Sequence, residues 1–224
     1  MLGELLSEAG YQVEVVEAFR RASLPADLGA EDILVVMGGP MGVADIGKPA
    51  TPWLAPVVDL LRSRLAKDWP NIGVCLGMQL IAHAAGAKVL PMTDGAGKPL
   101  REVGWGRLDF VGTDAITRGL PASVEVLHWH GDGCALPAGA TLLASTQVCP
   151  VQMFRLGRSC GMQFHPEIDG PTACLWAQED AQFVQAANGP DGVARLQAAS
   201  PEAARRTYAH RRRLLAQALA AVTA

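Results

Sequence analysis

The sequence IGVCLGMQLIAHAA, residues 72–85, passes directly from the pattern of a short buried strand to that of a helix. Cys75 lies at the junction, and Gly73 and Gly77 flank it. We expect the glycines to let the backbone turn sharply there and to keep the space around the side chain clear. A sulfur beside a helix N-terminus is favoured as a thiolate, the reactive form of cysteine. The junction therefore predicts a nucleophile, although a buried cysteine with a packing role fits the same five residues.

The segments around this junction alternate between strand and helix. Residues 33–37, ILVVM, form a continuous apolar run of the kind found in parallel strands covered on both faces. Apolar residues recur at helical spacing over residues 53–65, and residues 88–90 predict another strand. The alternation predicts an α/β sandwich with a mainly parallel central sheet. Elsewhere we expect a helix at 2–9, strands at 11–19, 102–110, 124–129, 141–144, 151–156 and 159–164, and helices from 171 onward with a break at 188–190.

The sequence FHPE, residues 164–167, carries a second set of reactive groups. Side chains two residues apart in an extended segment point the same way, so His165 and Glu167 share a face. Pro166 disfavours the helical region for the residue before it, which supports the extended conformation. A carboxylate near an imidazole can fix its tautomer and stabilise its charged form. Only the fold can bring this pair to Cys75, and an exposed histidine beside a surface glutamate is the alternative.

Gly38, Gly39 and Pro40 follow the apolar run at 33–37. Two glycines at the end of a buried strand expose backbone N–H groups and let a substrate approach closely. Beside a cysteine nucleophile, this loop becomes a candidate oxyanion hole together with the N–H of Leu76. Taken alone, the three residues also fit an ordinary loop.

Composition limits the classes of function. The chain has 224 residues, of which 50% are hydrophobic and 18% charged, and its net charge is −3. These values indicate a compact globule and give no reason to expect binding to nucleic acid or to a membrane. No apolar run approaches the roughly 18–20 residues of a membrane helix.

The cysteines and the two ends of the chain add three expectations. Five cysteines lack the spacing of a disulfide scaffold or of a zinc cage, and the first residues lack the features of a signal peptide. We therefore expect a cytoplasmic protein. The arginines near the C-terminus predict one solvated helix face, with a partner-docking surface as the alternative: Arg205, Arg206, Arg211, Arg212 and Arg213.

Several stretches together resemble the class I (triad) glutamine amidotransferase domain, especially its free-standing members related to the glutaminase domain of GMP synthetase. They are ILVVMGGPMGV at 33–43, GVCLGMQLIAHAAGAKV at 73–89, EVGWGRL at 102–108, VLHWHGD at 126–132 and GMQFHPEI at 161–168. The resemblance implies a flavodoxin-like three-layer sandwich. It places an amidotransferase domain at 1–170 and a C-terminal helical extension at 171–224, packed on the same domain.

The resemblance also implies a role for each matched residue. Cys75 would attack the side-chain amide of glutamine to form a γ-glutamyl thioester. His165 would activate the thiol and protonate the departing ammonia, while Glu167 would orient His165. Gly39 and Leu76 would hold the oxyanion through their backbone N–H groups. The other pocket residues would be Gln79, His130, Gly131 and Asp132, and no cofactor is implied.

Two details of the matched stretches need a separate interpretation. His128 and His130 share a face of their predicted strand, a spacing that metal sites also use, and Asp132 follows. We expect a pocket wall or a packing role instead of a metal site, because such histidine pairs on strands are common by chance. Val151 stands where relatives often carry asparagine, so any contact made by that side chain is absent here.

The substrate and the ammonia acceptor stay open at this stage. Either a separate synthetase subunit takes the ammonia released from glutamine, or the protein cleaves a γ-glutamyl substrate and transfers the product to water or another acceptor. A γ-glutamyl peptidase acting on γ-glutamyl peptides or conjugates is a close alternative. An α/β-hydrolase with a cysteine nucleophile is less favoured, because its acid usually precedes the histidine in the chain, whereas Glu167 follows His165. The intact Cys75, His165 and Glu167 count against a non-catalytic partner-binding domain.

Family members usually open with a short apolar strand before the first helix, whereas this sequence begins at that helix, MLGELLSEAG. In a flavodoxin-like order the first strand lies between the second and the third, which here are residues 12–17 and 33–37. We therefore expect residues 33–37 to lack a ladder partner on the side facing residues 12–17. We also hypothesise that the chain is an N-terminal truncation of a more stable form.

Overall fold

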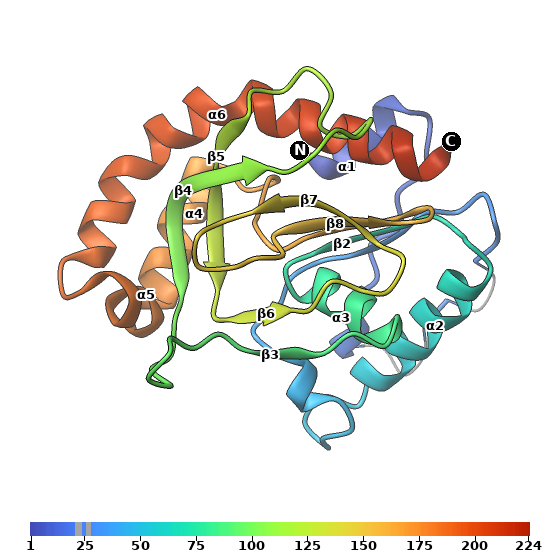
Figure 1. Cartoon of the computed structure of the whole chain (residues 1–224), viewed down its shortest axis with the longest axis horizontal. Helices are drawn as coiled ribbons and strands as arrows, with labels where there is room; N and C mark the ends of the chain where they lie inside the picture. Colours follow the sequence, from blue (N-terminus) through green and yellow to red (C-terminus); the bar gives the residue numbers. More distant parts are fainter. Residues whose placement is uncertain (21–23, 26–27) are drawn as a thin grey trace.

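The computed structural model describes residues 1–20, 24–25 and 28–224, and it has an α/β architecture with a curled seven-stranded sheet (Figure 1). Its helices are α1 (Leu2–Glu8), α2 (Leu54–Ala66), α3 (Leu76–Ala84), α4 (Gly170–Glu179), α5 (Ala181–Asn188) and α6 (Gly192–Thr223). Its strands are β1 (Leu34–Val36), β2 (Asn71–Val74), β3 (Val89–Pro91), β4 (Glu102–Phe110), β5 (Ser123–His130), β6 (Asp132–Cys134), β7 (Thr141–Ser145), β8 (Met153–Leu156) and β9 (Ser159–Met162). Two short 3₁₀ turns, η1 (Ala18–Arg20) and η2 (Val43–Asp45), lie in the connections.

The sheet is mixed, with the order β1-β2-β9-β8-β7-β4-β5. Only β1, β2 and β9 run parallel to one another, and the other neighbouring pairs are antiparallel. The expectation of a mainly parallel sheet is therefore corrected, although the flavodoxin-like α/β class stands. Connection length explains one of these pairs: residues 157–158 alone join β8 to β9, and a turn this short can only produce an antiparallel pair. The strand expected at 88–90 forms as β3 but pairs with β6 outside the main sheet.

The N-terminal segment differs most from expectation. Residues 11–17 form no strand, and Val13 and Val15 are 43% and 77% exposed. The β preference of valine describes a good fit to a half-buried pleated surface, and here no such surface covers the segment. Among the described residues β1 pairs only with β2, so its other edge has no ladder partner, as we expected for residues 33–37.

Two apolar layers enclose the sheet and give the three-layer arrangement. On one side α1 and α6 pack against it through buried residues such as Leu5, Leu214 and Leu215. On the other side α2 and α3 do so through residues such as Leu61 and Ile81. This packing fixes the carboxyl end of β2 between the layers, next to the start of α3. In the described part of the chain, no helix is both long enough and apolar enough to cross a membrane.

The arginines of α6 do not form one solvated face. Arg205, Arg206 and Arg212 lie on the surface and pair with acidic side chains. Arg211, in contrast, is 1% exposed. It lies on the side of the helix that faces the sheet, which it shares with Leu214 and Leu215, so the expectation of a single solvated face is wrong for this residue.

Candidate active site

Cys75 occupies a strained backbone position between β2 and α3. Its φ of 54° and ψ of −111° lie outside the regions that L-residues normally adopt, at a cost of about 1–3 kcal/mol. Neighbouring elements hold this conformation, because the Cys75 N–H donates to the Met162 carbonyl at 2.7 Å and the Gln79 N–H donates to the Cys75 carbonyl at 3.1 Å. Such strain clusters at functional sites, where it presents one side chain at the end of a sheet.

The two glycines around Cys75 are required for close packing. A Cβ on Gly77 would lie 1.8 Å from the Val36 carbonyl oxygen in β1, and a Cβ on Gly73 would lie 2.5 Å from the Gly77 backbone. Neither glycine has a positive φ, whereas Cys75 does. The sharp turn is therefore made by the cysteine itself, and the glycines let β1, β2 and α3 approach one another.

His165 is held at the end of the β9 segment by its backbone and by its ring. Its N–H donates to the Leu127 carbonyl at 2.8 Å, and its Nδ1 lies 2.8 Å from Glu167 Oε1. Burial alone would lower the pKa of His165. The hydrogen bonds with the Cys75 side chain and with Glu167 outweigh burial and raise the pKa of His165 to about 10. Glu167 thus fixes the ring orientation and favours its protonated form.

Cys75 and His165 meet beside Gly38. A Cβ built on Gly38 would lie 3.3 Å from the Cys75 Cβ and 3.1 Å from the His165 Cε1. Any larger residue at this position would therefore press on both reactive side chains. The Cys75 sulfur also lies 3.8 Å from the Trp129 carbonyl oxygen. The fold thus gathers the strand end, the FHPE segment and the glycine loop at one place.

An aromatic wall adjoins the imidazole. The Trp176 ring in α4 meets the His165 ring edge-on, with a centroid distance of 4.9 Å, and meets the Trp129 ring at 5.6 Å. The Trp129 Nε1 donates to Asp180 at 3.0 Å, which ties β5 to the end of α4. Sequence reasoning missed Trp176, because only the packing of α4 brings it to the site.

The expected oxyanion residues lie next to this cluster. Leu76 is the first residue of α3, so its N–H is one of those that have no acceptor within the helix. Gly39 lies against it, since a Cβ on Gly39 would be 3.5 Å from the Leu76 Cδ2. Gln79 is buried on the same helix, where its amide donates to Gln163 Oε1 at 3.1 Å.

The side chains of the HGD segment, residues 130–132, lie in two different environments. The His130 ring is buried, with Nδ1 at 3.0 Å from the Asp132 carbonyl and Nε2 at 3.2 Å from a Glu102 carboxylate oxygen. The Asp132 carboxylate instead faces the loop after β1, where a Cβ on Gly42 would be 3.3 Å away. Burial raises the pKa of Asp132, and the negative charge of Asp45 adds to this effect. Gly131 packs near Phe183 of α5.

One group among the described residues has the composition of a metal site, namely Glu102, His130 and Cys149, whose ligand atoms lie within 4.8 Å of one another. Its polar atoms already bond within the protein, since Gln152 donates to Glu102 at 2.6 Å. Burial raises the pKa of Cys149 to about 12, which keeps the thiol protonated. His128 is not in this group, and burial lowers its pKa to about 4. The arrangement is a buried hydrogen-bond network beneath the HGD segment.

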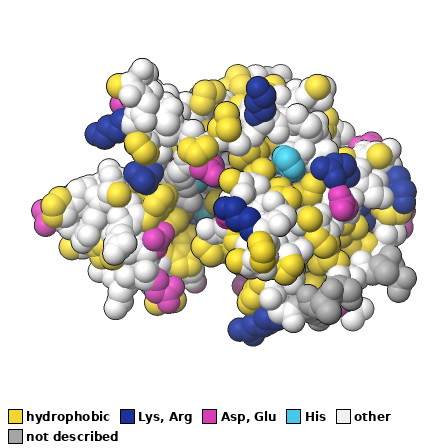
Figure 2. All heavy atoms as spheres, turned by 90° about the horizontal axis from the view of Figure 1, so that it is seen from below, with side chains coloured by type: hydrophobic (Ala, Val, Ile, Leu, Met, Phe, Trp, Pro, Cys, Tyr) yellow, Lys and Arg dark blue, Asp and Glu magenta, His cyan; other side chains and the backbone are white. Residues whose placement is uncertain are grey.

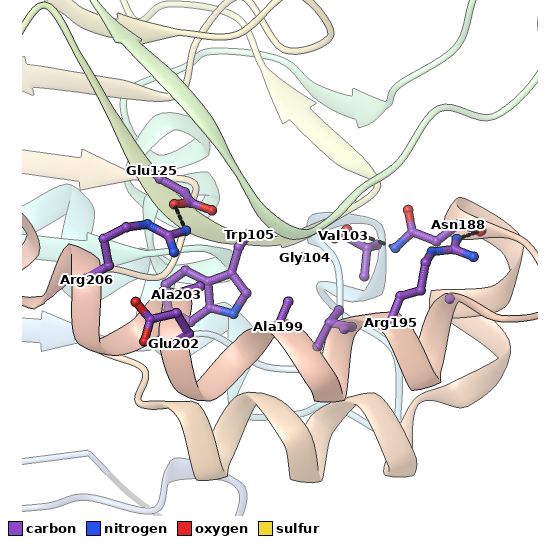
Figure 3. Close-up of a pocket in the computed structure, with 12 residues that line it drawn as sticks. Val103, Gly104, Trp105, Glu125, Asn188, Arg195, Ala199, Glu202, Ala203 and Arg206 are labelled. Carbon is purple, nitrogen blue, oxygen red and sulfur yellow. Dashed lines mark hydrogen bonds and ion pairs between the residues drawn. The ribbon is translucent and has the colours of Figure 1, made fainter.

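Two surface hollows are lined by residues other than Cys75. One groove of about 390 Å³ runs between β4 and α6, and Figure 3 shows its side chains. Its charged ends are already engaged, because Arg206 pairs with Glu125 and Arg195 donates to the Asn188 carbonyl. A second hollow of about 560 Å³ lies beside the end of α3.

Figure 2 shows charges of both signs scattered among hydrophobic side chains on the lower face of the molecule.

Comparison with known proteins identifies the family. The model of the family "Glutamine amidotransferase class-I" matches residues 1–173. A GMP synthase [glutamine-hydrolyzing] of Syntrophomonas wolfei is 36% identical over 148 residues, which cover 65% of this chain and 28% of that protein. A GMP synthase [glutamine-hydrolyzing] of Ectopseudomonas mendocina is 33% identical over 162 residues, which cover 64% of this chain and 28% of that protein. The matched region thus spans little more than a quarter of these curated relatives.

A solved structure agrees with this assignment. The crystal structure of a glutamine amidotransferase from Thermotoga maritima superposes with a TM-score of 0.81 at 25% identity, over 100% of this chain and 91% of that chain. The chain belongs to the class-I glutamine amidotransferase family. The resemblance read from the sequence motifs is therefore confirmed.

Proposed function

We propose that this protein hydrolyses the γ-amide of glutamine through a thioester on Cys75 and releases ammonia. Membership of the class-I glutamine amidotransferase family supports this chemistry in its general form. The observation that carries the specific proposal is the arrangement of His165, which interacts with the Cys75 side chain and is bonded to Glu167. This is the nucleophile–base–orienter arrangement that covalent catalysis by a thiol requires.

The first half of the reaction forms the thioester. The Cys75 sulfur attacks the amide carbon of the glutamine side chain, after its proton has passed to His165. The oxygen of that amide takes up negative charge, and the N–H groups of Gly39 and Leu76 stabilise it. The C–N bond then breaks, and protonated His165 gives its proton to the leaving nitrogen, which departs as ammonia.

The second half of the reaction restores the enzyme. His165 takes a proton from a water molecule, and the resulting hydroxide attacks the thioester carbon. The C–S bond breaks, glutamate leaves, and the proton on His165 is shared again with the released sulfur, which restores the starting pair. Glu167 keeps the ring in one orientation through both halves, because its bond to Nδ1 leaves Nε2 for the reacting groups.

Pocket recognition forms part of the same proposal. We assign Gln79, His130, Gly131 and Asp132 to the glutamine pocket, in addition to the oxyanion residues. Asp132 faces the loop that carries Gly39, which supports a role for its carboxylate at the mouth of the site. We assign catalysis to residues 1–170 and treat residues 171–224 as an extension on the same domain. We further propose a cytoplasmic location.

The acceptor of ammonia is proposed from the relatives. Curated relatives are named GMP synthase [glutamine-hydrolyzing], and the chain matches only part of their length. We propose a separate synthetase subunit as the acceptor, and the names of these relatives support a partner of that kind.

A panel of γ-glutamyl substrates tests the proposal. Purified protein would be incubated with glutamine, γ-glutamyl dipeptides and glutathione, and the release of ammonia, glutamate and free amines would be measured. We expect ammonia and glutamate from glutamine, and no turnover by Cys75→Ala. Preferred release of amino acids from γ-glutamyl peptides would instead support a peptidase, and no turnover of any compound would contradict the proposal.

A further inference from the structure

Arg211 stands out among the arginines of α6 because its guanidinium is buried. The residue is 1% exposed, whereas the adjacent Arg212 pairs with Glu8 at the surface. Burying a charged group is costly unless its hydrogen-bonding capacity is used. The partners of this guanidinium therefore indicate what the residue does.

Its Nη1 donates to one backbone carbonyl within the FHPE segment and to one immediately after it. The distances are 2.7 Å to the Pro166 oxygen and 2.8 Å to the Ile168 oxygen. These two residues stand immediately before and after Glu167. One nitrogen of Arg211 thus holds the carbonyls of the two residues that flank Glu167, the residue that bonds His165.

The rest of the guanidinium is anchored to α6 and to β4. Its Nε donates to Thr207 Oγ1 at 2.8 Å, and its Nη2 donates to the Ala204 carbonyl at 2.9 Å. The Trp105 ring lies 5.2 Å from its Cζ, and the Trp105 Nε1 donates to Ser200 Oγ at 3.0 Å. A planar group fixed at each of its three nitrogens has one orientation, so it is a rigid support for the segment it holds.

The segment needs such a support, because the sheet does not hold it. His165 makes an isolated bridge to Leu127, and residues 166–169 have no strand pairing. Glu167 Oε1 bonds the His165 Nδ1, while the other carboxylate oxygen, Oε2, is buried without a hydrogen-bond partner among the described residues. The position of the carboxylate is therefore set by the backbone that carries it.

The charges around the Arg211 guanidinium agree with a role near Glu167. Burial lowers the pKa of Arg211, and the nearby acidic groups Glu167 and Asp169 oppose that effect. Glu167 thus favours the charged form of the guanidinium.

We infer that Arg211 is a positioning residue of the catalytic site, which holds the backbone on both sides of Glu167 so that its carboxylate meets His165. The inference rests on the proposed function. It makes the last helix a participant in the alignment of a site that lies some 45 residues earlier in the sequence.

The first test separates catalysis from stability. Replacing Arg211 with Met should lower kcat for glutamine by about 100-fold with little change in KM, because a shift of about 1 Å in a catalytic group can cost that much. Arg211→Lys should recover part of the loss, since an ammonium still reaches a carbonyl but lacks the fork. Arg212→Met, on the exposed side of α6, should change kcat less than twofold. Leu215→Ala is the matched control, as it destabilises the same helix by removing part of a buried side chain in the apolar layer.

The second test measures the reactivity of Cys75 and does not depend on turnover of a substrate. The alkylation rate of Cys75 by iodoacetamide would be measured against pH for the wild type and each variant. We expect the pH of half-maximal rate to move upward in Arg211→Met, because a misplaced Glu167 no longer stabilises the protonated His165 that accompanies the thiolate. Arg211→Lys should show a smaller shift in the same direction, and it carries the test if the Met variant does not fold.

An alkylation profile that is unchanged in both Arg211 variants would overturn the inference, as would a loss of kcat no larger than that of Leu215→Ala at equal stability. If the proposed function is wrong, the wild-type protein will turn over none of the γ-glutamyl compounds. The alkylation profile would still decide the role of Arg211 in that case.

Discussion

At the scale of single residues, the site combines one strained residue with one strongly perturbed histidine. Cys75 adopts a positive φ that costs free energy, and the β2–α3 junction maintains it. His165 is buried, yet its neighbours favour the protonated ring. Strain at a thiol and a raised pKa at the adjacent imidazole are features of a group prepared for nucleophilic attack.

The reactivity of the five thiols should differ sharply. Burial raises the pKa of Cys134, Cys149 and Cys160 to about 12, so these thiols stay protonated at neutral pH. Cys75 has a histidine partner instead and should react first with one equivalent of iodoacetamide, with activity lost in step. Peptide mapping by mass spectrometry would identify the site. First labelling at Cys174, which is half-buried, with parallel loss of activity would argue against Cys75.

The raised pKa of His165 predicts a pH dependence of stability. The folded protein binds the proton more tightly than the unfolded chain, because the pKa rises from 6.5 to about 10. This contribution to the free energy of unfolding is fully present below pH about 6.5 and is lost as the pH rises to about 10. Urea unfolding at pH 6, 8 and 10 would compare the wild type with His165→Gln. The stability difference between the two should shrink with pH, and a difference that grows would contradict the assigned shift.

At the scale of elements, local patterns were predictable and long-range contacts were not. The strand–helix junction around Cys75 follows from neighbouring residues, so it could be predicted before the fold was known. The contact of Arg211 with the Pro166 carbonyl depends on how α6 packs, and no short pattern encodes it. The strand expected at 11–19 failed because Val13 and Val15 have no sheet to join.

The close approach of α3 to β1 predicts a severe effect of Gly77→Ala. Helix propensity alone would favour alanine by about 1 kcal/mol. The clash of its Cβ with the Val36 carbonyl should outweigh this and destabilise the fold by about 3 kcal/mol or more. Gly95→Ala is the matched control, because no atom lies within 4 Å of its Cβ, and it should change stability by less than about 0.5 kcal/mol. Equal unfolding midpoints in urea would show that the junction is not tightly packed.

At the scale of the whole molecule, the C-terminal helices form part of the core and of the site. α6 supplies Leu214, Leu215 and Ala218 to the same apolar layer as α1. α4 supplies Trp176 against His165, and α6 supplies Arg211 to the loop that carries Glu167. The mixed sheet in the middle brings these groups together from distant parts of the chain, as Figure 1 shows for α4 and α6.

This arrangement predicts that α6 contributes to global stability. Leu215 is fully buried, so Leu215→Ala should cost about 2–5 kcal/mol in the free energy of unfolding. Leu175 in α4 is 52% exposed, and Leu175→Ala should cost much less. Urea denaturation followed by circular dichroism would measure both variants. A similar small loss for the two would mean that α6 is not packed into the core.

The thioester on Cys75 is the central claim, and peptide mapping by mass spectrometry after rapid acid quenching tests it most directly. Protein would be mixed with ¹³C-labelled glutamine, quenched during turnover, digested and mapped. We predict a labelled γ-glutamyl group on the peptide that contains Cys75, and neither this adduct nor ammonia from Cys75→Ala. Ammonia release by Cys75→Ala, or turnover by the wild type with the labelled group on a different residue, would contradict the account.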